Sequence, residues 1–234
     1  MAIDHASSYG ILPGLENMQA VIRQVALGAP DAIMLMKGPA ERCFQALAGR
    51  IALILKCTTS SLFHPDRDIW IQSVEEAVGL GADAIAMAVT IGSADQPEHL
   101  RHLSQLIREA DKAGLPVIAH SYPCGEKISA AERYTLKEVG YASRIAMEMG
   151  VDVVKTFYTG SEETFAEVVR LASPALVVAA GGPRLDSRAD LMRMTRAVIG
   201  SGAAGVTFGR NVWQCDDIPG IIAELKAIVH SPAR

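Results

Sequence analysis

Residues 149–158, MGVDVVKTFY, contain the pattern from which the fold can be predicted. Gly150 is expected to close a helix, and after a short turn a β-branched run leads into Lys155. The same order of glycine, turn and apolar run recurs in LGAPDAIMLM (residues 27–36), LGADAIAMAV (80–89) and SGAAGVTFGR (201–210). This weak internal repeat predicts helix–strand units that follow one another along the chain.

Eight apolar runs are predicted to be strands, at residues 2–5, 32–36, 51–57, 84–90, 116–121, 151–157, 175–180 and 205–209. Helical patterns fill every gap between them, and the shortest covers residues 39–48. The clearest helix is predicted for residues 97–113, with Asp95 as its N-cap and Gly114 as its end.

The alternation of strands and helices decides between two α/β folds. Eight βα units with short αβ turns and no linker-like segment predict a single (β/α)₈ TIM barrel that spans residues 1–234. The alternative is a doubly wound open sheet, but no GxGxxG follows the first strand and no GxxxxGK[ST] occurs. Because the first predicted strand begins almost at Met1, any segment that covers the barrel floor is expected to be absent or very short.

The composition agrees with a layered α/β protein and excludes several classes. Half of the residues are hydrophobic and only 5% are aromatic, so the core must be aliphatic. A formal net charge of −4 gives no electrostatic footprint for nucleic acid, and no apolar run is long enough to cross a membrane. There is no secretory signal pattern, and the four cysteines are scattered without a CxxC pair. We therefore expect a cytoplasmic protein with reduced thiols.

Lys155 is the least expected residue in these strands. A lysine within an apolar strand is costly, so its amine is either used chemically or reaches solvent at the strand end. A buried amine has a depressed pKa and can form a Schiff base with a carbonyl substrate. Polar residues follow nearly every other predicted strand, where a barrel carries its active site, and this clustering favours the chemical role of Lys155.

Two glycine-containing loops predict a phosphate site. Gly181 and Gly182 follow the seventh predicted strand, and Gly209 and Arg210 follow the eighth. Glycines allow backbone N–H groups to approach an anion, a helix N-terminus adds a favourable dipole, and Arg210 can add a charged hydrogen bond. The loops after these two strands are also where barrels often bind phosphate.

Schiff-base chemistry also needs a group that moves protons. Tyr122 ends the strand next to that of Lys155, and the alternative is an ordinary loop tyrosine. Asp4, at the end of the first strand, could bind a substrate hydroxyl or move protons, or could instead cap the following turn.

Three further strand-end residues each have more than one candidate role. His5 and His120 could contact substrate or serve in packing. Lys56 could keep Lys155 neutral by repulsion, pair with Asp4, or bind a second phosphate. A metal held by residues such as Asp4, His5, His120 and His64 is disfavoured, because none of them has metal-ligand spacing such as HExxH. We expect neither a metal nor an organic cofactor.

Five motifs carry a resemblance to a known family over essentially the whole chain. They are DHASSYG (residues 4–10), SYPCG (121–125), VDVVKTFYTG (151–160), GGPR (181–184) and GVTFGRNVWQ (205–214). The sequence resembles the DeoC/FbaB-type (DhnA-type) class I aldolases, and within them the archaeal-type fructose-1,6-bisphosphate aldolases.

The resemblance implies a TIM barrel that cleaves or forms a carbon–carbon bond through a lysine Schiff base, without a metal. It implies that Lys155 forms the Schiff base, that Tyr122 transfers protons, and that Asp4 contacts substrate hydroxyls, together with His5. It further implies that Gly181, Gly182, Gly209 and Arg210 hold phosphate, and that the chain forms homo-oligomers built on pentameric rings.

The substrate is predicted less sharply than the chemistry. The leading expectation is fructose 1,6-bisphosphate, cleaved to dihydroxyacetone phosphate and glyceraldehyde 3-phosphate. Cys124 stands where the family commonly has arginine, and Arg184 stands where it has lysine, so substrate recognition differs from the common pattern. The alternatives are a related transfer reaction, as in aminodideoxyheptulosonate synthases or the autoinducer-2 phosphate thiolase, and a non-catalytic barrel that binds a sugar phosphate.

Overall fold

The computed structural model describes residues 1–231, with the side chain of Asp66 excepted. Seven parallel strands form one curled sheet. In spatial order they are β1 (Ala32–Leu35), β2 (Ala52–Lys56), β5 (Ala84–Thr90), β6 (Val117–Tyr122), β7 (Val153–Phe157), β8 (Leu176–Ala180) and β9 (Gly205–Thr207). Each corresponds to a predicted strand, and β5 has the predicted bounds.

The first residues of the chain close this sheet into a barrel. The Ala2 N–H donates to the carbonyl of Phe208, just beyond β9, at 2.8 Å, and the Ile3 N–H donates to Met34 of β1 at 3.1 Å. Ala2 also forms a parallel bridge with Met34. The predicted strand at residues 2–5 therefore occupies the eighth position, although its regular pairing is limited to this one bridge.

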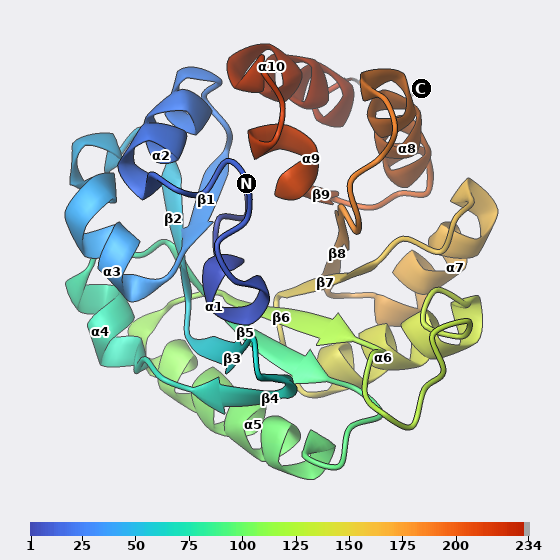
Figure 1. Ribbon diagram of the computed structural model, residues 1–234. Helices are drawn as coiled ribbons and strands as arrows, with labels where there is room; N and C mark the ends of the chain where they lie inside the picture. Colours follow the sequence, from blue (N-terminus) through green and yellow to red (C-terminus); the bar gives the residue numbers. More distant parts are fainter. Residues whose placement is uncertain (232–234) are drawn as a thin grey trace.

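Helices surround the strands, as Figure 1 shows. The main ones are α2 (Met18–Leu27), α4 (Val74–Gly79), α5 (Gln96–Ala113), α6 (Leu136–Glu148), α7 (Glu162–Ala172), α8 (Arg188–Gly200) and α10 (Ile218–Val229). Short helices α1 (Ala6–Tyr9) and α9 (Arg210–Trp213) follow the first segment and β9, at the carboxyl ends of the strands. The TIM-barrel prediction is confirmed, because the parallel sheet curls inside a helical ring.

The structure corrects three local predictions. Residues 58–70 form no helix, but an antiparallel hairpin of β3 (Thr58–Ser61) and β4 (His64–Trp70). The predicted helix at residues 39–48 is broken into α3 (Lys37–Pro39), a π-helical turn and a 3₁₀ turn. Asp95 precedes α5 but its side chain caps nothing, and it approaches Arg67 instead, at 3.8 Å. The predicted end of α5 at Gly114 is confirmed by its left-handed conformation, with φ +64°.

The barrel interior has an apolar layer beneath a charged one. Ala2, Met34 and Ala86 are fully buried there, against the partly buried Ile54 and Ile118. Residues two positions further along these strands point the same way, because strand side chains alternate. The next layer upward therefore includes Asp4, Lys56 and His120, which follow Ala2, Ile54 and Ile118 by two positions.

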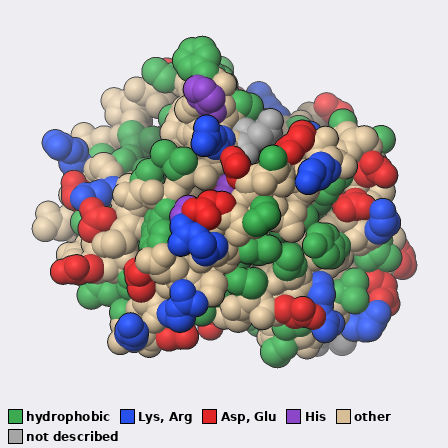
Figure 2. Space-filling model, turned by 90° about the horizontal axis from the view of Figure 1, so that it is seen from below, with side chains coloured by type: hydrophobic (Ala, Val, Ile, Leu, Met, Phe, Trp, Pro, Cys, Tyr) green, Lys and Arg blue, Asp and Glu red, His purple; other side chains and the backbone are tan. Residues whose placement is uncertain are grey.

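The surface shows charges of both signs. Figure 2 shows one face, on which Lys and Arg are interspersed with Asp and Glu. Several of these side chains pair along helices, as Arg101 does with Glu98 and Arg144 with Glu148. Within residues 1–231, no helix combines the length and the apolar character that crossing a membrane requires.

Candidate active site

Lys155 lies in the middle of the sheet, at the level of the charged layer. In the register of the strands it pairs with His120 of β6 and Val178 of β8, and only 6% of its surface is exposed. A cavity of about 180 Å³ opens above it at the carboxyl ends of the strands. The predicted site residues Asp4, His5, Lys56, Tyr122 and Lys155 all line this cavity.

The charge on Lys155 is poorly stabilised. Burial lowers the pKa of Lys155 to about 8; the negative charge of Asp4 opposes this shift, and the positive charge of Lys56 adds to it. A substantial share of the amine is therefore neutral near pH 7.5, which is the state that attacks a carbonyl.

Lys56 has two of the three roles considered from the sequence. Its Nζ lies 3.9 Å from Asp4 Oδ2 and donates to the Thr58 carbonyl at 3.2 Å. It therefore pairs with Asp4, and its charge also lowers the pKa of Lys155. These contacts hold the Lys56 ammonium deep in the cavity, where it is 7% exposed.

Asp4 is a buried carboxylate among cations. Burial favours its protonated form, but Lys155, Lys56 and His5 together hold the pKa of Asp4 below its usual value. Its Oδ1 lies 3.5 Å from His5 Nδ1. Asp4 does not cap α1. The N-cap residue of this helix is His5, which makes no side-chain cap bond. The carboxylate therefore faces the cavity as an acceptor.

Tyr122 and His120 are both held uncharged. Burial, followed by the charge of Asp4, raises the pKa of Tyr122 well above its usual value, so its phenol keeps its proton. The ring stacks on Phe157 of β7, with centroids 4.6 Å apart. Burial, followed by Lys155, lowers the pKa of His120 well below its usual value. The cavity thus contains both a neutral proton donor, the Tyr122 phenol, and a partly neutral amine, that of Lys155.

A second cavity, of about 380 Å³, lies toward the amino ends of the strands and also reaches Lys155 and His120. Aliphatic residues line much of it, among them Ile118 and Val153, which stand two positions before His120 and Lys155 on their strands. Lys155 is therefore bounded below by apolar side chains, which explains why desolvation dominates its pKa.

The two predicted phosphate loops lie next to each other. Arg210 donates from Nη2 to the Gly182 carbonyl at 3.0 Å, and its guanidinium lies over the Tyr9 ring, 5.5 Å from the centroid. A Cβ on Gly209 would lie 2.5 Å from His5 Cε1, so only glycine fits there. Gly182 has a left-handed φ of +63°.

Asn211, which sequence reasoning missed, ties these loops together. Its Nδ2 donates to the carbonyls of Gly181 and Pro183 at 2.9 and 3.0 Å, and its Oδ1 accepts from the Leu185 N–H at 2.7 Å. The side chain is buried, and its three hydrogen bonds hold the two loops against each other. The only sequence signal was its place directly after Arg210.

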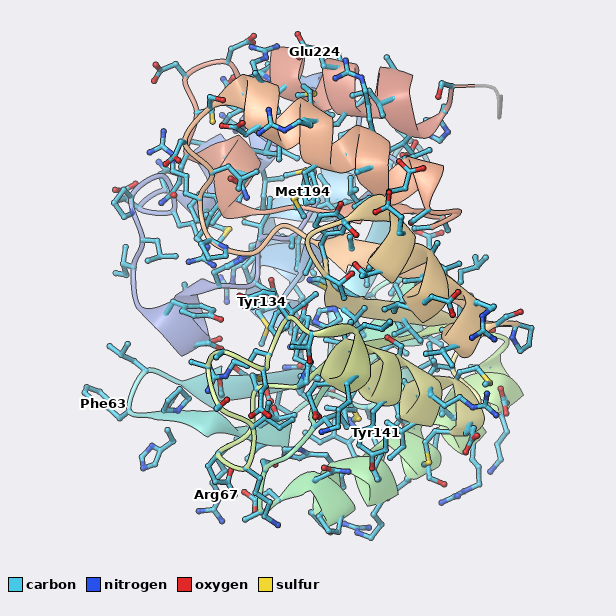
Figure 3. The ribbon with its side chains drawn as sticks, turned by 90° about the vertical axis from the view of Figure 1, so that its right-hand side faces the viewer. Phe63, Arg67, Tyr134, Tyr141, Met194 and Glu224 are labelled. Carbon is cyan, nitrogen blue, oxygen red and sulfur yellow. The ribbon has the colours of Figure 1, made fainter. Side chains whose placement is uncertain are left out.

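The hairpin contributes a residue that the sequence did not indicate. Asp68 of β4 lines the cavity and accepts a hydrogen bond from Thr90 Oγ1 at 2.9 Å. Figure 3 labels Phe63, at the hairpin tip, and Arg67; both project from the molecule with the hairpin. Among the described residues, no group of three or more His, Cys, Asp or Glu side chains is placed to hold a metal ion.

Comparisons with known proteins identify the family of the chain. The model of the DeoC/LacD family of aldolases matches residues 1–215. The chain is 32% identical to a 2-amino-3,7-dideoxy-D-threo-hept-6-ulosonate synthase of Halobacterium salinarum, over 99% of this chain and 86% of that one. It is also 32% identical to a class 1 fructose-bisphosphate aldolase of Thermoproteus tenax, over 93% and 83%.

A solved structure adds the chemistry. An archaeal fructose-1,6-bisphosphate aldolase, whose catalytic lysine is covalently bound to the carbinolamine intermediate of its substrate, superimposes with a TM-score of 0.91 and 30% identity. The match covers 99% of this chain and 93% of that one. The chain therefore belongs to the DeoC/LacD family of aldolases, and within it to the class I enzymes that act through a lysine Schiff base.

Proposed function

We propose that this aldolase cleaves or forms a carbon–carbon bond in a phosphorylated ketose, with Lys155 as the Schiff-base lysine. The observation that carries the proposal is the meeting, in one cavity, of an amine whose pKa is lowered to about 8 with a protonated phenol and a carboxylate. Fructose 1,6-bisphosphate is the leading expectation from the sequence, and dihydroxyacetone phosphate, the ketone half of that substrate, is the reference ligand for the trapping tests.

The proposed cycle begins when neutral Lys155 Nζ attacks the ketose carbonyl. Tyr122 donates a proton to the carbinolamine hydroxyl, water leaves, and an iminium forms. Asp4 or Tyr122 accepts the proton of the hydroxyl on the far side of the scissile bond. The bond electrons flow into the iminium to give an enamine, and the aldehyde leaves. Protonation of the enamine carbon and addition of water then release the ketone and restore Lys155.

The loops after β8 and β9 are proposed to hold the phosphate at the carbonyl end of the ketose. Backbone N–H groups near Gly181, Gly182 and Gly209 can donate to phosphate oxygens, and Arg210 can add a charged contact. One loop follows β8, the neighbour of β7, and the other follows β9, the next strand along, so a phosphate there leaves the adjacent carbonyl within reach of Lys155.

Borohydride trapping tests the proposal directly. Dihydroxyacetone phosphate plus borohydride is expected to add the mass of the reduced adduct to the peptide that contains Lys155, read by mass spectrometry. Lys112, exposed at the end of α5, is the internal control and should remain unmodified. Folded protein with Lys155 unmodified by every ketose phosphate tried would overturn the proposal.

The trapping rate is expected to depend on pH. Below pH 8 the neutral fraction of Lys155 falls about tenfold per unit, so trapping should rise with pH and level off above about 8. Lys56→Met removes a positive neighbour, so the pKa of Lys155 and the inflection should both move upward. An inflection that stays in place in this variant would contradict the charge coupling of the two lysines.

Arg210→Gln tests the phosphate loops. A lost hydrogen bond to a charged group is expected to raise KM for a phosphorylated ketose roughly 10- to 100-fold. The matched control is Arg193→Gln, because Arg193 is exposed on α8, where it pairs with Asp190, and belongs to none of the family motifs. Equal effects of the two variants on KM would place the phosphate elsewhere.

A transfer reaction is the second candidate, because the synthase from Halobacterium salinarum is as similar to the chain as the aldolase from Thermoproteus tenax. Product analysis with phosphorylated donors and a panel of aldehyde and thiol acceptors separates transfer from simple cleavage. A homo-oligomeric, ring-shaped assembly and a cytoplasmic location remain predictions. Light scattering of the purified protein can test the assembly.

A further inference from the structure

The β3–β4 hairpin forms one wall of the active-site cavity. Ser60 Oγ of β3 donates to Ser8 Oγ of α1 at 2.8 Å, and the neighbouring Thr59 hydroxyl donates to Ser7 Oγ at 2.7 Å. Thr58 Oγ1 accepts from the Ala88 N–H of β5 at 2.8 Å. These bonds join the hairpin to α1 on one side and to the barrel on the other, so its side chains have fixed places in the wall.

Asp68 is the charged residue that this wall presents to the cavity. Its Oδ2 accepts from Thr90 Oγ1, at the end of β5, and the second carboxylate oxygen is left for another donor. Strand alternation turns the neighbouring Arg67 outward, where 72% of its side chain is exposed and its Nε lies 3.8 Å from Asp95. The guanidinium therefore does not neutralise Asp68 from within the cavity.

The order of the strands places Asp68 across the barrel from the proposed phosphate loops. Thr90 ends β5, Tyr122 ends β6, Lys155 lies on β7, and the loops follow β8 and β9. In a closed barrel, the ends of β5 and β9 are on opposite sides of the mouth. A ketose with its phosphate at the loops and its carbonyl at Lys155 must extend its remaining carbons toward Tyr122, Thr90 and Asp68.

The cations of the cavity are not available at this far wall. Among the described side chains that line the cavity, the lysines are Lys56 and Lys155, and both lie near Asp4. Lys56 is already held by the Asp4 carboxylate and the Thr58 carbonyl, and Lys155 is committed to the substrate carbonyl. A doubly charged phosphate at the far wall would meet the Asp68 carboxylate in a partly buried site, which is strongly unfavourable.

We propose that the aldehyde half of the substrate ends in an uncharged hydroxyl group and carries no phosphate, with Asp68 as the residue that sets this specificity. This inference rests on the proposed function and names its substrate class: a ketose monophosphate whose phosphate is at the carbonyl end. Asp68 accepts a hydrogen bond from a hydroxyl of the aldehyde half and repels a phosphate at the same position.

The test is the synthetic direction, with dihydroxyacetone phosphate as donor and two aldehydes that differ only in phosphate. Wild-type enzyme is expected to use glyceraldehyde with a kcat/KM about tenfold or more above that for glyceraldehyde 3-phosphate, because only the latter brings charge to Asp68. Asp68→Asn should raise kcat/KM for glyceraldehyde 3-phosphate about tenfold and change that for glyceraldehyde only a few-fold, since the asparagine carbonyl can still accept from Thr90 and its NH2 group can donate to the oxygen of the substrate hydroxyl.

Asp95→Asn is the matched control, because Asp95 is also acidic, pairs with Arg67, and does not line the cavity. Its ratio of the two kcat/KM values should equal that of the wild type. A wild-type preference for glyceraldehyde 3-phosphate, or a ratio unchanged by Asp68→Asn, overturns the inference.

Failure of the inference is distinguishable from failure of the proposed function. Borohydride trapping with dihydroxyacetone phosphate needs no aldehyde half, so it reports on Lys155 alone. Trapping at Lys155 with the wrong aldehyde preference overturns only the role of Asp68. An absence of trapping overturns the proposed function and, with it, this inference.

Discussion

Lys155→Met is expected to lower kcat by at least about four orders of magnitude, because the covalent intermediate can no longer form. Methionine has nearly the length of lysine and suits the apolar layer beneath it, so the variant should fold. The readouts are turnover of the ketose phosphate and loss of borohydride trapping, beside an unchanged circular dichroism spectrum.

Lys112→Met is the control for this substitution. It makes the same chemical change on the exposed surface of α5 and should keep full turnover. A folded Lys155→Met enzyme that retains a tenth or more of wild-type kcat would exclude Lys155 as the Schiff-base residue. Lys56, the other lysine of the cavity, would then become the candidate nucleophile.

The barrel could be predicted from the sequence because its pattern of glycine, turn and apolar run is repeated along the chain. Each of the eight units carries its own glycine, turn or apolar run, so an error of a few residues at one strand end leaves the count intact. β5 was recovered within its bounds because all seven of its residues are buried, which gives the continuous apolar run of a strand covered on both faces.

The hairpin was not predictable from the same signal. β3 and β4 pair outside the barrel sheet, and most apolar side chains of the hairpin face solvent: in the turn Phe63 is 85% and Leu62 53% exposed, and on β4 Ile69 is 52% exposed. Burial therefore does not impose an alternating apolar–polar pattern on β3 and β4. The sequence around Pro65, with its charged neighbours, resembles a loop or the start of a helix. What holds the hairpin is hydrogen bonding to α1, between residues 52 positions apart, and to β5, between residues 30 and 22 positions apart.

The same distinction explains which site residues were found. Tyr122 ends β6, Lys155 lies within β7, and Asp4 directly follows buried Ala2 and Ile3, so each is a polar residue that departs from an apolar run. Asp68 lies among other polar residues, and only the fold brings it to Thr90. Asn211 likewise acts through carbonyls of another loop.

Tyr122→Phe is expected to lower kcat about 10²- to 10⁴-fold, the usual contribution of a positioned general acid. Phenylalanine keeps the ring that stacks on Phe157, so the loss reports on the hydroxyl and not on packing. Because the raised pKa of Tyr122 keeps its phenol protonated, the wild-type group is a donor throughout the neutral range, and dehydration of the carbinolamine is the step that slows.

Two measurements separate this role from a structural one. The rate of borohydride trapping at Lys155 should fall together with kcat, since borohydride reduces the iminium and not the carbinolamine, while KM for the ketose phosphate should change only a few-fold. Tyr141→Phe, on the exposed face of α6, is the control and should match the wild type. If Tyr122→Phe slows turnover but traps at the wild-type rate, the phenol acts after iminium formation, and the proton that dehydrates the carbinolamine must come from Asp4 or water.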